Sequence, residues 1–426
     1  MELEMKKGLQ GTFYGEIPAE WIACKFEDVL TGFSSGMTPY RGISEYYKGD
    51  IPWITSGELN YNIITDTIEK ITKEAVVKTN LKILPTGTFL MAITGLEAKG
   101  TRGSCAITGV EATTNQSCMA LFPLEGKADT GYLYHFYRMY GDVLAFHFCQ
   151  GSKQQSYTGK IAKILPINLP PTLAEQKAIA TALSDVDDLI SSLDALIAKK
   201  KAIKQGAMQQ LLTGRIRLNT FEKGKGYKET EIGLIPRDWE VVKIEDVFDF
   251  SGGSQPPKST FVFREKKGYI RLLQIRDYKK DNYKTFIPLN LAQKQCSAND
   301  IMIGRYGPPI FQILRGIEGA YNVALLKAIP KGIDKEYGYH FLKQDTLFDF
   351  VEKLSQRSSG QTGVDLDQLK LYILPLPSTI KEQKAIAQIL SDMDKELEEL
   401  ATKKEKYEHI KQGMMQELLT GKTRLI

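Results

Sequence analysis

The sequence predicts an α+β protein with two globular α/β-mixed domains, separated by two long helices that pair as an antiparallel coiled coil. Three observations predict this fold. The 426-residue chain contains an internal repeat. Each copy ends in a proline-free stretch whose apolar residues alternate at three- and four-residue spacing, which is typical of a coiled-coil helix. The region before each stretch mixes short β-rich apolar runs with turn signals and helical segments. The duplication predicts a pseudo-two-fold internal repeat.

The repeat has two offsets. The recurring segments are EQKAIA at 175–180 and 382–387, LLTG at 211–214 and 418–421, and a Gly-x-Ile-Pro-x-x-Trp motif at 15–21 and 233–239. The first two recur after 207 residues and the third after 218. The second globular region is therefore 11 residues shorter than the first. Closely copied helices with diverged globular regions indicate a shared framework that carries two different surfaces.

These motifs divide the chain into six parts. A polar stretch, NTFEKGKGYKET, has the composition of a linker between the halves. The predicted parts are an N-terminal extension at 1–14, a first domain at 15–172, a first helix at 173–218, the linker at 219–230, a second domain at 231–380 and a second helix at 381–426.

The long helices carry one apolar seam each, and Gly214 and Gly421 stand where a C-terminal cap glycine is expected. Either each helix packs on its own domain, or the two pack on each other; seams longer than a globular helix needs favour mutual packing. The residues predicted to pair the helices are Ile179, Leu183, Val186, Ile190, Leu193, Ile197, Ile386, Leu390, Met393, Leu397, Leu400 and Tyr407. Lysines follow in each seam, among them Lys204 and Lys411, which we interpret as weakening self-packing and as a contact for a partner.

Within the globular regions, short apolar runs predict strands and two longer segments predict helices. The expected strands are 51–54, 87–93, 268–273 and 301–303, and the expected helices are 130–148 and 335–354. Polar loops rich in glycine, threonine, glutamine and basic residues interrupt them.

These loops are candidate DNA contacts, because Arg, Lys and Gln can hydrogen-bond to base edges while Ser, Thr and Lys suit phosphates. The alternative is that they are ordinary solvated turns. The candidate residues are Ser35, Thr38, Tyr40, Arg41, Lys99, Arg102, Lys153, Gln154, Gln155 and Tyr157 in the first domain, and Gln255, Lys258, Gln274, Arg276, Lys279, Arg305, Tyr306, Arg357 and Gln361 in the second.

Composition limits the function. The net charge of +5 permits a nucleic-acid partner but is small for a protein that grips phosphates alone, so we expect modest DNA affinity without partners. No apolar run is long enough to span a membrane, and residues 1–13 lack an apolar signal core. The five cysteines show no CxxC spacing and indicate reduced thiols. We therefore expect a cytoplasmic protein with no membrane association.

No catalytic or metal-binding pattern is present in the sequence. Residues 307–311 (GPPIF) lack the Asn or Asp that opens the adenine methyltransferase motif. Residues 421–423 (GKT) resemble the end of a phosphate-binding loop, but they end a helix instead of opening one. The four histidines are scattered without ligand spacing. We therefore predict no catalytic residue, no metal site and no bound cofactor in this chain.

Together, these motifs resemble those of the specificity subunit of type I restriction-modification systems, over nearly the whole chain. The paired Gly-x-Ile-Pro-x-x-Trp motifs, LPPTLAEQ at 169–176, LPSTIKEQ at 376–383 and the LLTG helix ends carry the resemblance. SGMTP at 35–39 followed by GDIPW at 49–53 resembles an opening of that family's target-recognition domains. Met37 departs from the glycine more usual there, which bears on loop flexibility.

The resemblance implies a non-catalytic chain that recognises double-stranded DNA. Each domain would read one half of an asymmetric, bipartite target, and the helices would set the gap. Two methyltransferase subunits and two restriction/translocase subunits would join it, with S-adenosylmethionine, ATP and Mg on those partners only. The alternative is a coiled-coil scaffold with two protein-binding domains.

Overall fold

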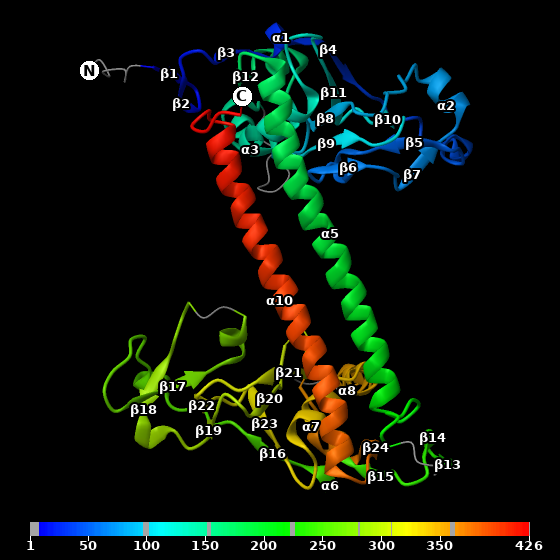
Figure 1. The fold of residues 1–426 in the computed structure, drawn as a ribbon, viewed down its shortest axis with the longest axis vertical. Coiled ribbons are helices and arrows are strands. Elements are labelled where there is room, and N and C mark those ends of the chain that lie inside the picture. The colour runs from blue at the N-terminus through cyan, green and yellow to red at the C-terminus, as the bar shows by residue number, and fades with distance from the viewer. Residues whose placement is uncertain are drawn as a thin grey trace. The chain divides into compact units, whose positions relative to one another are not determined.

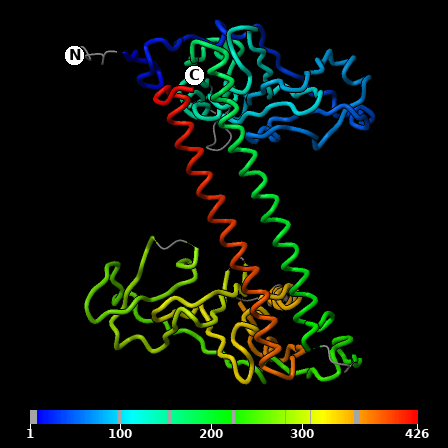
Figure 2. The backbone as a smooth tube through the Cα atoms, viewed as in Figure 1, coloured from blue at the N-terminus to red at the C-terminus, as the bar shows by residue number. Residues whose placement is uncertain are grey.

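A computed structural model describes residues 8–96, 102–150, 155–221, 226–279, 282–307, 309–357 and 363–425, without the side chains of residues 356 and 357. The chain forms two compact units. Unit 1 combines Met1–Asp194 with Lys403–Ile426, and unit 2 is Ala195–Thr402. The end of the chain thus belongs with the first domain, and the backbone trace shows the C-terminus returning to it (Figure 2).

Unit 1 opens with two small antiparallel pairs. β1 (Leu9–Thr12) forms a hairpin with β2 (Gly15–Pro18), and β3 (Ile22–Lys25) pairs with β12 (Pro166–Leu169). The short helices α1 (Phe26–Val29) and α4 (Gly159–Ile164) flank the second pair. β1 lies within the N-terminal extension predicted at 1–14 and is hydrogen-bonded to β2 of the first domain.

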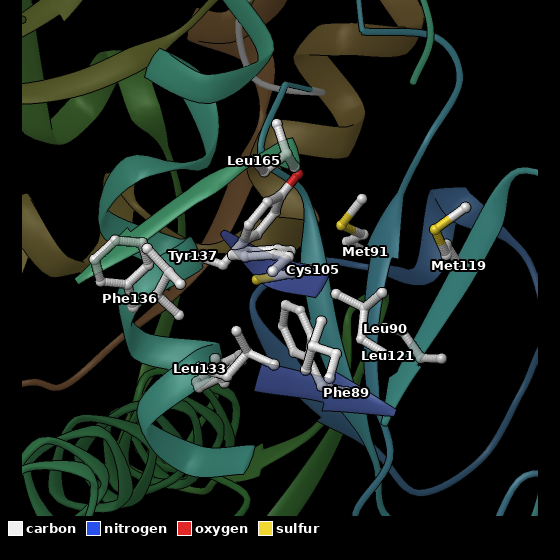
Figure 3. Packing of buried hydrophobic residues seen from close by; sticks show 14 of the residues in the cluster. Phe89, Leu90, Met91, Cys105, Met119, Leu121, Leu133, Phe136, Tyr137 and Leu165 are labelled. Carbon is white, nitrogen blue, oxygen red and sulfur yellow. The ribbon is translucent and has the colours of Figure 1, made fainter. Parts of the chain in front are cut away.

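The main sheet of unit 1 has five strands in the order β4-β11-β8-β9-β6. Their bounds are Leu30–Ser35, Cys118–Pro123, Phe89–Ala92, Cys105–Thr108 and Asn62–Ile64. Helix α3 (Thr130–Phe148) packs against this sheet, and its bounds match the prediction. Phe89 on the sheet meets Leu133 and Tyr137 on the helix in a fully buried core (Figure 3).

A second, smaller sheet of unit 1 has the order β10-β5-β7. Its strands are Thr113–Thr114, Ile51–Ile54 and Glu69–Ile71, and the nearby helices are α2 (Lys73–Lys78), η1 (Ser44–Tyr47) and η2 (Ser56–Glu58). Trp53, Ile71 and Ala75 form its own buried cluster. This sheet carries the loops that follow β4.

Unit 2 repeats the plan. Its hairpin is β13 (Tyr227–Thr230) with β14 (Gly233–Pro236), and β15 (Glu240–Lys243) pairs with β24 (Ile373–Leu376). The main sheet runs β16-β23-β20-β21 (Phe248–Gly252, Leu325–Pro330, Ile301–Gly304, Gln312–Arg315), and the second runs β18-β17-β22-β19 (Phe286–Pro288, Tyr269–Leu273, Gly319–Tyr321, Gln295–Cys296). The remaining short helices are α6 (Ile244–Val247), α9 (Leu366–Leu371), η3 (Lys258–Thr260), η4 (Ile275–Tyr278) and η5 (Leu289–Leu291). The linker predicted at 219–230 therefore already contains a strand.

The helix expected at 335–354 is two helices, α7 (Lys335–Leu342) and α8 (Asp345–Arg357). Lys343 caps α7 through its backbone N–H, and the side chain of Asp345 accepts a hydrogen bond from Gln205 on the long helix of the same unit. Contacts with a distant segment accompany the break, and the helical pattern of residues 335–354 alone does not predict it. The corresponding helix of unit 1, α3, is continuous.

The two long helices are α5 (Leu173–Leu211) and α10 (Ile380–Leu418), each 39 residues and thus about 58 Å at the usual rise per residue (Figure 1). Gly214 and Gly421 both have φ of +71° just beyond the helix ends. That left-handed conformation suits a C-terminal cap glycine, as predicted.

Within each unit the helical segments run antiparallel. In unit 1, Lys404 Nζ lies 2.7 Å from Asp194 Oδ1, and Lys411 pairs with Asp187. In unit 2, Lys200 Nζ lies 2.6 Å from Glu396 Oε1, and Lys204 pairs with Asp394. Residue numbers rise along α5 as they fall along α10, which confirms the predicted antiparallel pairing.

The two packing alternatives both hold, in different parts of each helix. The first turns bury Ile179 and Leu183 in the core of unit 1, and Ile386 and Leu390 in the core of unit 2. Later turns meet the other helix. The interpretation of the seam lysines is wrong for Lys204 and Lys411, because both are buried against aspartates of the same unit.

Candidate nucleic-acid interface

The repeated motifs build the junction between helix and domain. In unit 2, Arg217 makes bidentate ion pairs with Asp238, next to Trp239, and with Glu382 of the EQ motif. In unit 1, Arg424 pairs in the same way with Glu175 and also with Glu20, next to Trp21. The motif carboxylates therefore hold the end of one long helix against the start of the other.

The neighbouring glutamines cap the domain helices. Gln176 Oε1 accepts from the backbone N–H of Asp129, the N-cap of α3, at 2.9 Å. Gln383 Oε1 accepts from Asp334, the N-cap of α7, at 2.7 Å. At Gly421 an added Cβ would lie 2.6 Å from the Pro18 ring, so the LLTG end fits tightly on the Gly-x-Ile-Pro-x-x-Trp motif. These repeated residues are structural, which leaves recognition to the diverged loops.

Ser35 ends β4, and the loop that follows carries Thr38 and Tyr40. The start of this loop requires glycine at position 36, because an added Cβ would lie 1.8 Å from the carbonyl oxygen of Thr114. Met37 N–H donates to that carbonyl at 3.0 Å. The side chain of Tyr40 is 73% exposed, so the loop presents an aromatic ring to solvent.

Arg41, beside this loop, is held by several partners. Its guanidinium donates to both carboxylate oxygens of Glu69, at 2.5 and 2.7 Å, and lies over the rings of Tyr47 and Trp53. The Arg41 hydrogen bonds lower the pKa of Glu69. Arg41 therefore braces the loop, and a DNA contact by this residue stays a prediction.

Two further candidates of unit 1, Arg102 and Tyr157, are largely shielded from solvent. Arg102 Nε lies 3.2 Å from Asp142 Oδ1, and its side chain is only 17% exposed. Tyr157 is 3% exposed within the main core, and burial raises the pKa of its hydroxyl. The prediction for Tyr157 as an accessible DNA contact is therefore wrong. Thr158 is the N-cap of α4, and a hydrophobic residue just before an N-cap commonly packs inward, which is the signal that sequence reasoning missed.

Unit 2 presents a corresponding loop after β16. Gly253 would place a Cβ 2.0 Å from the Asn322 carbonyl oxygen, matching Gly36, and Gln255 and Lys258 beyond it are exposed. Arg276 and Lys279 are also exposed. These four side chains are exposed and therefore accessible to a ligand in solution.

Arg276 and three other candidates of unit 2 also make contacts within the unit. Gln274 and Arg276 both donate to Thr285 Oγ1, at 3.2 and 3.3 Å. Arg305 lies over the Tyr306 ring at 5.2 Å, and both are half-buried. Such contacts fix the orientation of these side chains beside the loops.

Gln155 is half-buried, and its carbonyl accepts from Leu96 N–H at 3.2 Å. The candidates outside the described residues are Lys99, Lys153, Gln154 and Gln361, to which the side chain of Arg357 is added.

A cleft of about 850 Å³ opens beside the β4 loop in unit 1. Phe33 and Met119 contribute apolar surface, and Ser35, Lys160 and Lys163 contribute polar groups. The two lysines are exposed and three residues apart on α4. Sequence reasoning missed both, although their spacing on one helical face was a signal. The matching positions on α9 are Asp367 and Lys370, so the two units differ in charge here.

The buried histidines have structural roles. His135 Nε2 lies 3.0 Å from Ser184 Oγ, and His340 Nε2 lies 2.9 Å from Ser391 Oγ. Burial lowers the pKa of each to about 4, which keeps both neutral at neutral pH. Over the described ranges, no group of three or more His, Cys, Asp or Glu side chains is arranged to hold a metal, and no helix is long and apolar enough to cross a membrane.

The duplicated α+β units, joined helix to domain by the repeated motifs, define the class of protein. The type I restriction modification DNA specificity domain family matches residues 18–205 and 236–409. The chain belongs to this family and is a type I specificity subunit.

Curated relatives match along the whole chain. The putative type I restriction enzyme MjaX specificity subunit of Methanocaldococcus jannaschii is 28% identical and covers 100% of this chain and 99% of its own length. The MjaVIII specificity subunit of the same organism is 27% identical over 96% of this chain and 94% of its own. The crystal structure of a type I S subunit from M. genitalium has a TM-score of 0.63 at 14% identity and covers 98% of each chain, which shows the shared fold.

Proposed function

We propose that this chain recognises an asymmetric, bipartite double-stranded DNA target, with one half-site read by each unit. One observation carries the proposal: the helix–domain junctions are duplicated in atomic detail, while the loops after β4 and β16 share a backbone geometry and differ in side chains. A shared framework with two different readers predicts two different half-sites.

The long helices are proposed to set the gap between the half-sites. Each is a single uninterrupted helix that leads the chain from one unit into the other. Buried Lys–Asp pairs fix how the helical segments meet within each unit. A rigid helical spacer of defined length is the property that a fixed gap requires.

The chain is proposed to act without chemistry of its own. We propose two methyltransferase subunits and two restriction/translocase subunits as partners, with S-adenosylmethionine, ATP and Mg bound by those partners, in the cytoplasm. The modest net charge of the chain supports this division of roles, because the partners would supply many of the contacts to DNA phosphates.

Exchanging the DNA-recognition segment of one unit tests the proposal. Residues 244–372 lie between the paired strands β15 and β24 and can be replaced by the matching segment of another family member. Methylome sequencing of cells that express the chimera with its methyltransferase subunit should show one changed half-site. A control chimera that replaces residues 26–165, between β3 and β12, should change only the other half-site.

A change in both half-sites with either chimera contradicts the assignment of one half-site to each unit. If the chimeras bind DNA without any sequence preference but still assemble with their protein partners, the result favours the scaffold alternative.

A further inference from the structure

The two units differ where the β1–β2 hairpin of unit 1 and the β13–β14 hairpin of unit 2 meet the first helix after the main sheet. In unit 1, Tyr14 at the turn of the β1–β2 hairpin packs its ring 5.2 Å from that of Phe136 and 4.2 Å from that of Tyr140. Its hydroxyl donates to the Pro166 carbonyl at 2.6 Å. Tyr14 thus fills the space between the hairpin, α3 and β12.

The matching position of unit 2 is Ile232. Both hairpins close with the same hydrogen bond, from Thr12 to the Gly15 carbonyl and from Thr230 to the Gly233 carbonyl. The residue before each glycine is Tyr14 in unit 1 and Ile232 in unit 2. The strand registers likewise equate Pro166, opposite Lys25, with Ile373, opposite Lys243. The helix N-caps Asp129 and Asp334 equate Phe136 with Phe341.

Unit 2 leaves this space open. A groove of about 690 Å³ is lined by Ile232, Phe341, Ile373 and Arg215, among others. Five residues past His340, where α3 carries Tyr140, unit 2 has Asp345, which follows the break between α7 and α8 and binds Gln205 instead. The rings of Tyr14 and Tyr140 therefore have no aromatic counterpart at the matching positions of unit 2, and the groove there is also lined by Tyr227 and Tyr372.

We propose that this groove is a docking site for a tyrosine side chain of a partner protein, carried on a segment with an acidic residue beside the tyrosine. The proposal rests on the proposed function only in that the partner would be another subunit of the complex. Unit 1 supplies the template, because its own tyrosine shows that an aromatic ring fits between the hairpin and the domain helix with its hydroxyl on the β-strand carbonyl.

The positive charge of Arg215 at the groove favours an acidic residue next to the docking tyrosine. Arg215 is exposed at the groove, and no ion pair of its guanidinium is found among the described residues. The apolar lining from Ile232, Ile235 and Phe341 suits the ring, and the guanidinium suits a carboxylate next to it. Among the described residues of unit 1, Tyr14 fills the matching space, so two copies of one partner would bind the two units unequally.

Small probes test the groove on the full chain without DNA or partner subunits. Calorimetry and ligand-observed NMR should show one site for p-cresol, and toluene, which lacks the hydroxyl, should bind about fivefold more weakly. Ile232→Tyr should reduce p-cresol binding at least tenfold, because the new ring occupies the groove as Tyr14 does. The matched variant Tyr14→Ile should raise the stoichiometry from one to two.

The acidic neighbour is tested with two dipeptides. Acetyl-Asp-Tyr-amide should bind about threefold more tightly than acetyl-Lys-Tyr-amide, and Arg215→Glu should reverse the order. No p-cresol binding, binding unaffected by Ile232→Tyr, or a single site in Tyr14→Ile would overturn the proposal. Unchanged dipeptide preference in Arg215→Glu would overturn the acidic neighbour. Because no DNA is present, these outcomes do not depend on whether the chain reads a bipartite target.

Discussion

Arg217 and Glu382 form a bidentate ion pair inside unit 2, with Nε and Nη2 of the arginine each 2.8 Å from a carboxylate oxygen. The Glu382 side chain is 1% exposed and that of Arg217 is 7% exposed. The pair joins the segment that follows α5 to the first turn of α10. This role of the carboxylates explains why the EQ motif and the Gly-x-Ile-Pro-x-x-Trp motif are both repeated in the sequence.

Removing Glu382 should therefore destabilise unit 2. Glu382→Ala leaves a buried guanidinium with Asp238 as its remaining partner, and breaking a buried pair typically costs about 3–5 kcal/mol. The free energy of unfolding in urea measures the loss. The matched variant Glu175→Ala should cost less, because its partner Arg424 is more exposed at 25%. An equal or larger loss for Glu175→Ala contradicts the assignment of burial as the cause.

The buried histidines should make the protein sensitive to mild acid. Burial lowers the pKa of His135 and of His340 from 6.5 to about 4, so as pH falls the unfolded chain takes up the protons first. Stability is complete above about pH 6.5 and should be lost between pH 6.5 and 4, by about 3 kcal/mol for each histidine. Urea unfolding at pH 7, 5 and 4 measures this loss.

The control for that experiment is His409→Gln, because His409 is exposed on α10. His135→Gln and His340→Gln should each flatten the acid dependence, whereas His409→Gln should leave it as in the unmodified chain. Identical pH profiles for all three variants would refute the buried-histidine explanation.

Lys160 and Lys163 should contribute to DNA affinity without setting sequence preference. Both are exposed beside the β4 loop cleft, and each lysine that meets a phosphate steepens the salt dependence of binding by about one unit. The double variant Lys160→Gln/Lys163→Gln should lower the slope of log Kobs against log salt by about two. Fluorescence anisotropy with target and non-target duplexes measures it, with Lys177→Gln on the exposed face of α5 as the control.

Lengthening the spacer should lengthen the gap in the target. The insertion belongs between Asp194 and Ala195 on α5, with a matching one between Thr402 and Lys403 on α10, because the chain passes between units at those positions. Four residues, about one helical turn, should leave both half-sites unchanged in methylome sequencing and widen the gap. The same insertion in the polar linker after Asn219 should leave the gap unchanged. An unchanged gap in the helix variant refutes the spacer role.

Local patterns predicted much of the secondary structure. β5 and α3 have the expected bounds, since a β-rich run and a capped helical segment are encoded by neighbouring residues. The candidate site was predicted less well. Tyr157 is buried and Arg41 is paired with Glu69, because the partners of a loop side chain come from distant strands. Lys160 and Lys163 were missed because a solvated helical face and a cleft wall have the same sequence pattern.

The sequence by itself determined the duplication, the presence of two long helices and their cap glycines, because helical period and capping depend on residues within one or two turns. The helices end at Leu211 and Leu418, before the predicted ends at 218 and 426. Only the tertiary structure decided which segments join. It placed the end of α10 in unit 1, buried the seam lysines Lys204 and Lys411 against half-buried aspartates, and left a groove at Ile232 where unit 1 has Tyr14. Each of these depends on contacts between residues far apart in the chain, and a buried charge is stable only where the fold supplies its partner.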